Sequence, residues 1–136
     1  MKEWALPVLG TWLCWGLWGF LPKLTVQYLS PRSATVYQIC GGLVVALLIL
    51  RSLHFQPEAH PWGVCLAIAT GMVGFLGALF YLAAVIRGPV TLVATLTALY
   101  PLLSIALAWL LLGETISLKQ GLGLVFGLIA LVLLAT

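Results

Sequence analysis

Charged side chains are scarce in this chain. They make up 7% of the residues, whereas 63% of the residues are hydrophobic. An average soluble domain is about 25% charged and less than half apolar. A water-soluble globule of 136 residues could not hide so much apolar surface from solvent. The composition therefore excludes an ordinary soluble domain and indicates a membrane protein.

Other residue types are too sparse or too scattered for several classes of site. Cys14, Cys40 and Cys65 have no short repeated spacing and no clustered histidines nearby, so we predict neither a disulfide framework nor a metal site. The net charge of +3 is too small for a nucleic-acid or polybasic lipid-binding patch. Because no Ser/His/Asp set or carboxylate pair lies at one membrane depth, we expect neither an enzyme nor a cofactor.

Five long apolar stretches lie between the few charges. We place them at residues 4–29, 33–51, 62–86, 90–112 and 118–135. Each has roughly 18 to 25 residues, enough at 1.5 Å per residue to cross a hydrocarbon core of about 30 Å. Lipid admits only helices and closed barrels, and these stretches lack the alternation of barrel strands. The sequence therefore predicts an all-α integral membrane protein with five transmembrane helices.

Helix boundaries are marked at three of the four connections. Ser30 is an N-cap followed by a proline, Pro31, at the first helical position. Gly88 and Pro89 end one stretch and open the next, and Ser117–Gln120 matches a capping box. The fourth connection, residues 51–61, is the only polar one of any length. We expect His54 and His60 in it to be solvated loop residues rather than ligands.

Two prolines within the stretches predict helix kinks. Pro22 and Pro101 each remove a backbone donor and free the carbonyl four residues earlier, at Trp18 and Thr97. Such kinks are common packing features. For the Thr97–Pro101 region, a packing role and a role in a substrate cavity remain open alternatives.

Small residues share helix faces with polar or aromatic residues on the first four stretches. Polar groups at membrane depth tend to face the bundle interior and to mark pathways, although small-residue stripes also arise from plain helix packing. We therefore expect a narrow, aromatic and mostly neutral substrate cavity. Its expected lining residues are Trp12, Trp15, Gly16, Gly19, Lys23, Gln38, Tyr81, Thr97, Tyr100 and Ser104.

Three further residues have expectations of their own. Gly123 and Gly127, four apart on the last helix, are expected to serve helix packing because nothing polar accompanies them. Lys23 lies near the far membrane interface, so its side chain either snorkels to that interface or turns inward to contact substrate or hold a gate. These two interpretations of Lys23 remain open at this point.

The second half of the chain carries a recognisable pattern. A proline lies midway along the fourth helix, Gly-Glu stands at its end, and a glutamine and a glycine open the fifth; these are Pro101, Gly113, Glu114, Gln120 and Gly123. The first half agrees at Trp15, Gly16, Lys23, Ser30 and Pro31. With this pattern the chain resembles one EamA repeat of the drug/metabolite transporter superfamily, which implies a single domain over residues 1–136.

The resemblance implies transport of small metabolites by alternating access in a plasma membrane, such as a bacterial inner membrane. Most relatives carry two five-helix repeats, whereas this sequence has one, and relatives often have an arginine where this chain has Gln38. Within the pattern, Glu114 is expected to be structural. Its charge favours the N-terminus of the fifth helix and can pair with Arg51 or Lys119.

Two alternative functions stand beside a transporter of small organic or drug-like solutes. One is a non-transporting membrane subunit that scaffolds a partner. The other is a cation exporter like the small multidrug resistance proteins, which use a glutamate in the middle of the first helix. Here residues 11–15 contain no acid, which disfavours that chemistry.

The charge distribution bears on assembly in the lipid bilayer. The five-helix topology places three basic residues on each side of the membrane: Lys2, Arg51 and Lys119 on one, Lys23, Arg32 and Arg87 on the other. Such a balance gives no orientation preference. We therefore expect an antiparallel homodimer whose two copies share one substrate cavity, with a parallel dimer or a partner protein as rivals.

Overall fold

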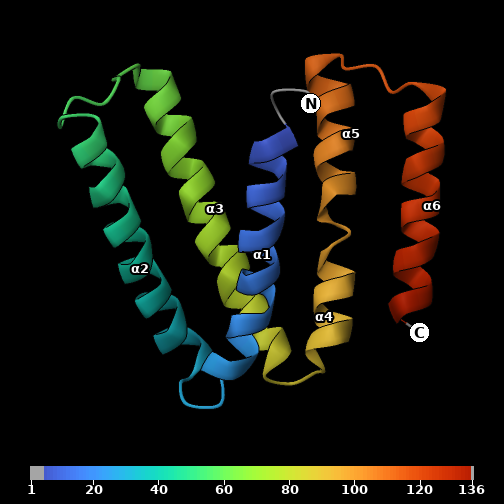
Figure 1. The fold of residues 1–136 in the computed structure, drawn as a ribbon, viewed down its shortest axis with the longest axis horizontal. Helices are drawn as coiled ribbons and strands as arrows, with labels where there is room; N and C mark the ends of the chain where they lie inside the picture. Colours follow the sequence, from blue (N-terminus) through green and yellow to red (C-terminus); the bar gives the residue numbers. More distant parts are fainter. Residues whose placement is uncertain (1–4, 136) are drawn as a thin grey trace. The chain divides into compact units, whose positions relative to one another are not determined.

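The computed structural model describes residues 5–135, with side chains up to residue 133. The expected start of the first helix at Trp4 and the charge of Lys2 lie outside the described residues. The described chain has no strand, and its helical segments are α1 (Ala5–Thr25), α2 (Pro31–Ser52), α3 (Pro61–Val85), α4 (Val90–Thr97), α5 (Tyr100–Leu112) and α6 (Leu118–Ala135) (Figure 1). The all-α fold class is thus confirmed.

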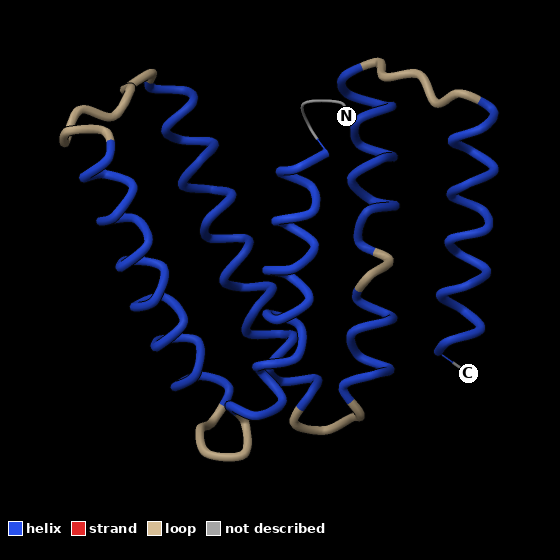
Figure 2. The backbone as a smooth tube through the Cα atoms, viewed as in Figure 1, coloured by secondary structure: helices blue, strands red, loops and turns tan. Residues whose placement is uncertain are grey.

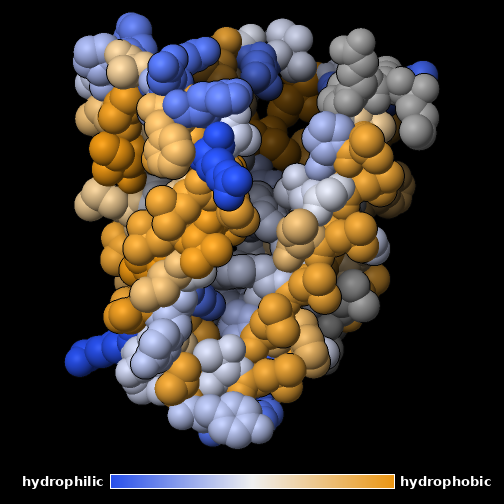
Figure 3. Space-filling model, turned by 60° about the vertical axis from the view of Figure 1, so that its left-hand side comes forward, coloured by the Kyte–Doolittle hydropathy of each residue, from blue (hydrophilic) through white to orange (hydrophobic). Residues whose placement is uncertain are grey.

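The helices fit a membrane-spanning chain. By length and hydropathy, α1, α2, α3 and the stretch Val90–Leu112 can each cross a membrane, and Leu118–Leu133 of α6 is a shorter apolar segment. Most large apolar side chains are exposed, as expected for residues that face lipid rather than water. Figure 3 shows apolar surface over much of the middle of one face, with hydrophilic residues gathered along its upper edge.

The fourth stretch is interrupted rather than continuous. Figure 2 shows the non-helical step between α4 and α5, at Ala98 and Leu99, two residues before Pro101. Pro101 has no N–H to donate to the Thr97 carbonyl, and the chain tightens there, with Leu102 N donating to Leu99 O at 3.0 Å. In contrast, α1 continues through Pro22 and ends three residues later, at Thr25.

The end of α1 is the largest difference from the expected boundaries. We expected the helix to reach residue 29, but residues 26–28 form turns, with Tyr28 N donating to Thr25 O at 3.1 Å. The reason lies in the next helix. Ser30 precedes a proline and must be extended, with φ −65° and ψ 153°, so the chain has to leave the helix before it.

Side-chain caps set the helix starts. Ser30 Oγ accepts from Ser33 N at 3.3 Å, and Ser117 and Gln120 form a reciprocal capping box, in which Ser117 N donates to Gln120 Oε1 at 2.9 Å and Gln120 N to Ser117 Oγ at 3.4 Å. His60 remains exposed, as expected of a loop residue, but its Nδ1 also accepts from Gly63 N at 3.3 Å and caps α3.

The chain divides into two compact units, residues 1–87 and 88–136. In the first unit, α3 packs against both α1 and α2. Its core lies where α1 and α3 end and α2 begins, and consists of Pro22, Ala34, Thr35, Ala78, Tyr81, Leu82 and Val85. In the second unit α4 packs against α6, and neither α4 nor α5 has a buried residue.

Candidate functional site

Two hydrogen bonds join α1 to α3 near the ends of both helices. Tyr81 Oη donates to the carbonyl of Gly19 at 2.6 Å, and Lys23 Nζ donates to the carbonyl of Val85 at 2.7 Å. Each pair is separated by 62 residues, and the two helices run in the same direction (Figure 1). The bonds therefore lie one helical turn apart in a single parallel register.

Aromatic packing and a glycine support the Tyr81 bond. The Trp18 and Tyr81 rings lie 5.2 Å apart between centroids, tilted by 36°. A Cβ placed on Gly19 would lie 3.7 Å from Tyr81 Oη, which is ordinary contact distance. The phenol thus lies in contact with the α1 backbone at Gly19.

Lys23 is held at the C-terminal end of α3. The last carbonyls of a helix lack partners within the helix and carry partial negative charge, so an ammonium is favoured there. Lys23 is half-buried, and Val85, whose carbonyl it contacts, is wholly buried. This placement gives Lys23 a structural contact, while a role toward substrate stays a prediction.

The opposite half of the α1–α3 seam is open. Continuing the same register would place Trp15 opposite Gly77 and Trp12 opposite Gly74, but a Cβ at either glycine meets no atom within 4 Å. Trp12 is 71% exposed and Trp15 58%. Gly16 likewise has open space around it. The seam is therefore closed at the C-terminal ends of the two helices and open toward their N-terminal ends.

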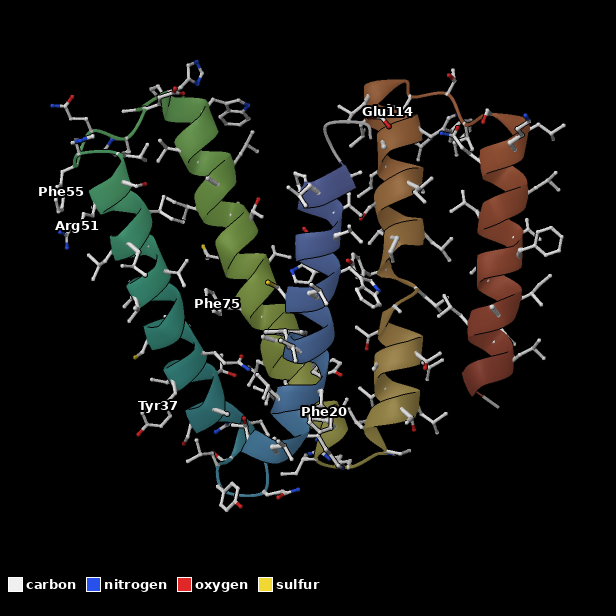
Figure 4. The ribbon with its side chains drawn as sticks, in the orientation of Figure 1. Phe20, Tyr37, Arg51, Phe55, Phe75 and Glu114 are labelled. Atoms are coloured by element: carbon white, nitrogen blue, oxygen red, sulfur yellow. The ribbon has the colours of Figure 1, made fainter. Side chains whose placement is uncertain are left out.

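A second seam joins α2 to α3. A Cβ on Gly42 would lie 3.2 Å from the ring of Phe75, whose side chain projects from α3 toward α2 in Figure 4. One turn before Gly42, Gln38 is half-buried, and its Oε1 is covered and has no hydrogen-bond partner. One turn further back, Ala34 is 1% exposed. Gln38 thus lies in a closely packed seam, and its side-chain oxygen is an unsatisfied hydrogen-bond acceptor.

The remaining expected cavity residues belong to the second unit. Thr97 Oγ1 donates to Val93 O at 2.6 Å, within its own helix. Tyr100 is exposed at the start of α5. Ser104 lines a groove of about 700 Å³ between α5 and α6. The structure thus groups Gly19, Lys23 and Tyr81 closely, with Gln38 on the neighbouring seam. Thr97, Tyr100 and Ser104 lie in the second unit.

The groove of the second unit contains the residues of the expected structural motif. Glu114, Gln120, Gly123 and Gly127 all line it, and Glu114 lies at the end of α5 (Figure 4). A Cβ on Gly123 or Gly127 meets no atom within 4 Å, so neither glycine packs closely against the described chain. Glu114 and Lys119 are both described, and they form no ion pair with each other.

Possible metal ligands do not cluster among residues 5–135. No group of three or more His, Cys, Asp or Glu residues there could hold a metal ion. Cys14, Cys40 and Cys65 are exposed free thiols. The contacts described between α1 and α3 are hydrogen bonds, an aromatic contact and the ammonium group of Lys23.

Comparison with known proteins gives one family. The model of the EamA-like transporter family matches residues 2–136. Over 92 residues, 67% of this chain, the sequence is 32% identical to the chloroplastic phosphoenolpyruvate/phosphate translocator 2 of Arabidopsis thaliana. Over 124 residues, 85% of this chain, it is 31% identical to the uncharacterized transporter YyaM of Bacillus subtilis (strain 168). No solved structure matches.

The relatives are much longer than this chain. The matched regions cover 24% of the Arabidopsis protein and 39% of the Bacillus protein. The family model, in contrast, matches residues 2–136 and so includes every described helix.

Proposed function

Because the chain belongs to the EamA-like transporter family, we propose that it moves small organic solutes across a membrane by alternating access, as an exporter or facilitator. A multi-pass membrane transporter of the drug/metabolite type is what the family and the relatives support. The mechanism, the class of solute and a plasma-membrane location are the proposal.

The observation that carries the mechanism is the asymmetry of the α1–α3 seam. Alternating access requires a pathway that is closed on one side of the membrane while it is open on the other. In the first unit, Tyr81 and Lys23 close one end of the seam, whereas toward the other end a Cβ added at Gly74 or Gly77 meets no atom within 4 Å. A scaffold subunit has no need for this difference between the two ends.

The side chains available favour a flat or amphipathic solute of amino-acid to drug size. Trp12 and Trp15 offer broad apolar surfaces with a polar edge. The described basic residues all lie near helix ends or in loops, and the acids Glu58 and Glu114 lie in loops. A neutral or zwitterionic solute therefore fits better than an inorganic ion. The absence of an acid at Thr11–Trp15 weighs against a small multidrug resistance-like cation exporter.

A second copy of the chain is proposed to complete the substrate pathway. The matched relatives are more than twice as long as the regions they share with this chain. The balanced basic residues allow insertion in both orientations, so the proposed assembly is an antiparallel homodimer. Reporters fused after Thr136 should register on both sides of the membrane in comparable amounts. Signal from one side alone would favour a parallel dimer or a partner protein.

The test of transport begins with a thermal-shift screen of small organic solutes on the purified protein, followed by flux of each hit into liposomes. Trp12→Ala and Trp15→Ala should reduce that flux at least tenfold, because they remove the aromatic walls of the open seam. Trp62→Ala is the matched control, since Trp62 is an exposed tryptophan at the start of α3. Normal flux in folded Trp12 and Trp15 variants would assign these residues to packing, and no flux of any hit would favour the scaffold.

A further inference from the structure

We propose that Gln38 is the hydrogen-bond acceptor for an uncharged or zwitterionic solute that carries an N–H or O–H donor. This inference rests on the proposed transport function and names the class of solute. It starts from the covered Oε1 of Gln38, which has no hydrogen-bond partner. A buried acceptor without a donor is costly, and such groups in native proteins call for a physical explanation.

Three side-chain donors of the first unit are already used within the protein. Thr35, three residues earlier on α2, donates its hydroxyl to Pro31 O at 2.8 Å. Tyr81 of α3 donates to Gly19 O, and Lys23 of α1 to Val85 O. Along the α2–α3 seam Phe75 lies against Gly42, and the buried residues Ala78 and Leu82 of α3 are apolar. No described donor of the first unit satisfies Gln38 Oε1, which is therefore available to a donor on a solute.

A carboxamide oxygen selects for a donor without selecting for charge. It accepts one or two hydrogen bonds and cannot neutralise an ammonium group. The described acids lie in loops, outside α1, α2 and α3. A site built around Gln38 therefore discriminates between a solute with an N–H or O–H group and its methylated analogue. Sites that hydrogen-bond a substrate group reject analogues lacking that group far more strongly than apolar pockets reject a missing methylene.

Gln38 can present its oxygen to a solute without movement of the helix backbone. Part of the side chain remains exposed although Oε1 is covered. Rotation about the side-chain bonds changes the direction of the amide without moving α2. The amide can thus turn its oxygen from the packed seam toward the exposed side when a donor arrives.

Two properties of Gln38→Met test this assignment, since methionine keeps the length of the side chain and removes both polar atoms. The first is thermal unfolding of the full chain in lipid nanodiscs without ligand. We expect Gln38→Met to unfold at the same or a higher temperature than the wild type, because the variant no longer buries an unsatisfied acceptor. Gln27→Met, at an exposed turn of the same unit, is the control. A clear fall in unfolding temperature specific to Gln38→Met would show a structural role and overturn the proposal.

The second property is binding of benzamide and N,N-dimethylbenzamide, two flat neutral probes that differ in their N–H donors. The wild type should bind benzamide about tenfold more tightly than the dimethyl compound, because only benzamide can donate a hydrogen bond to Gln38 Oε1. In Gln38→Met this preference should disappear, while Gln27→Met should keep it. Equal binding of both probes by the wild type, no binding of either, or a preference that survives in Gln38→Met would each overturn the proposal.

The two proposals can fail separately. Gln38-dependent preference for benzamide, together with no flux of any solute into liposomes, would leave the binding site standing and remove the transport function. Flux of a screened solute that is unchanged in Gln38→Met, with no probe preference, would leave transport standing and remove the role of Gln38.

Discussion

The two units of the chain differ in what lies against particular glycines. In the first unit, Gly19 and Gly42 stand against aromatic side chains, at 3.7 Å from Tyr81 Oη and 3.2 Å from the Phe75 ring. In the second unit, Gly123 and Gly127 line a groove and have no neighbour within 4 Å of an added Cβ. Gly19 and Gly42 thus lie in closed seams, whereas Gly123 and Gly127, like Gly74 and Gly77 of the first unit, have open space beside them.

This difference teaches that spacing alone does not say what a glycine packs against. Small residues let helices approach, but approach also needs a partner that fills the space. In the first unit the partners are aromatic rings and two side chains that bond to main-chain carbonyls across the seam. In the second unit, the described chain supplies none at Gly123 and Gly127. The variants below test whether the units differ in this way, from the largest expected effect to the smallest.

Removing the ammonium of Lys23 should have the largest effect on the first unit. Lys23→Met loses a charge-assisted hydrogen bond to Val85 O, and hydrogen bonds to charged groups contribute about 1.5–3 kcal/mol. We expect a loss of that size in the free energy of unfolding, measured in mixed micelles by tryptophan fluorescence. Arg87→Met is the control, because the exposed Arg87 bonds only to Ala83 within its own segment.

The same variant separates the two interpretations of Lys23. If Lys23 holds a gate, Lys23→Met should change solute flux while Lys23→Arg, which keeps a donor, restores most of it. Unaltered flux in a folded Lys23→Met protein would support snorkelling at the interface.

Filling the α2–α3 seam should be nearly as costly. Gly42→Leu drives a side chain into the Phe75 ring, and overpacking of a close seam typically costs about 1–3 kcal/mol. Gly41→Leu, at the neighbouring position with open space, is the matched control and should cost less than half as much. Equal unfolding free energies for the two variants would contradict the close packing of α2 against α3.

Tyr81→Phe should produce a smaller loss, because the ring contact with Trp18 remains and only the bond to Gly19 O is lost. Hydrogen bonds between membrane helices contribute about 0.6 kcal/mol on average and up to about 1.7 kcal/mol. Tyr37→Phe, on the exposed face of α2, is the control and should be neutral. A neutral Tyr81→Phe would mean that aromatic packing alone holds the end of the α1–α3 seam.

The sequence predicts the helices well because their signals are local. Apolar length, Ser30 before Pro31 and the Ser117–Gln120 box each depend on a few adjacent residues. The observed boundaries agree within two residues except at the end of α1 and at the break between α4 and α5. The capping role of His60 was missed, although a polar acceptor just before Pro61 is a detectable N-cap signal.

The site is harder to predict because its contacts join residues far apart in the chain. Helical periodicity placed Gly19 and Lys23 on one face of α1, but it could not reveal that their partners are Tyr81 and Val85, 62 residues away. Nor could it reveal that the Gln38 oxygen is covered without a donor, since this depends on how α2 meets α3. Periodicity gives faces, whereas registers between helices come from packing of whole surfaces.

In the second unit, Glu114→Gln should have a modest effect on stability and less on affinity for any solute. Glu114 precedes α6, where a negative charge near a helix N-terminus contributes about 0.3–1 kcal/mol. It has no ion pair with Lys119 to add to this. Thr115→Val, on the same connection, is the control for a polar loss without a charge. Intact stability with abolished flux would make Glu114 a transport residue instead of a structural one.

The smallest effect is expected at Gly127, and it bears most directly on the comparison of the two units. Gly127→Leu directs its new side chain into the groove between α5 and α6, where no atom lies within 4 Å of an added Cβ. Replacing a helical glycine also removes a conformational cost of up to about 1 kcal/mol. We therefore expect the free energy of unfolding to stay equal or rise slightly, as it should for Gly121→Leu, which lies outside the groove lining. A loss at Gly127 that Gly121→Leu does not share would mean that something fills the groove when the protein is folded in lipid. The two units would then use their glycines alike, and the contrast between them would disappear.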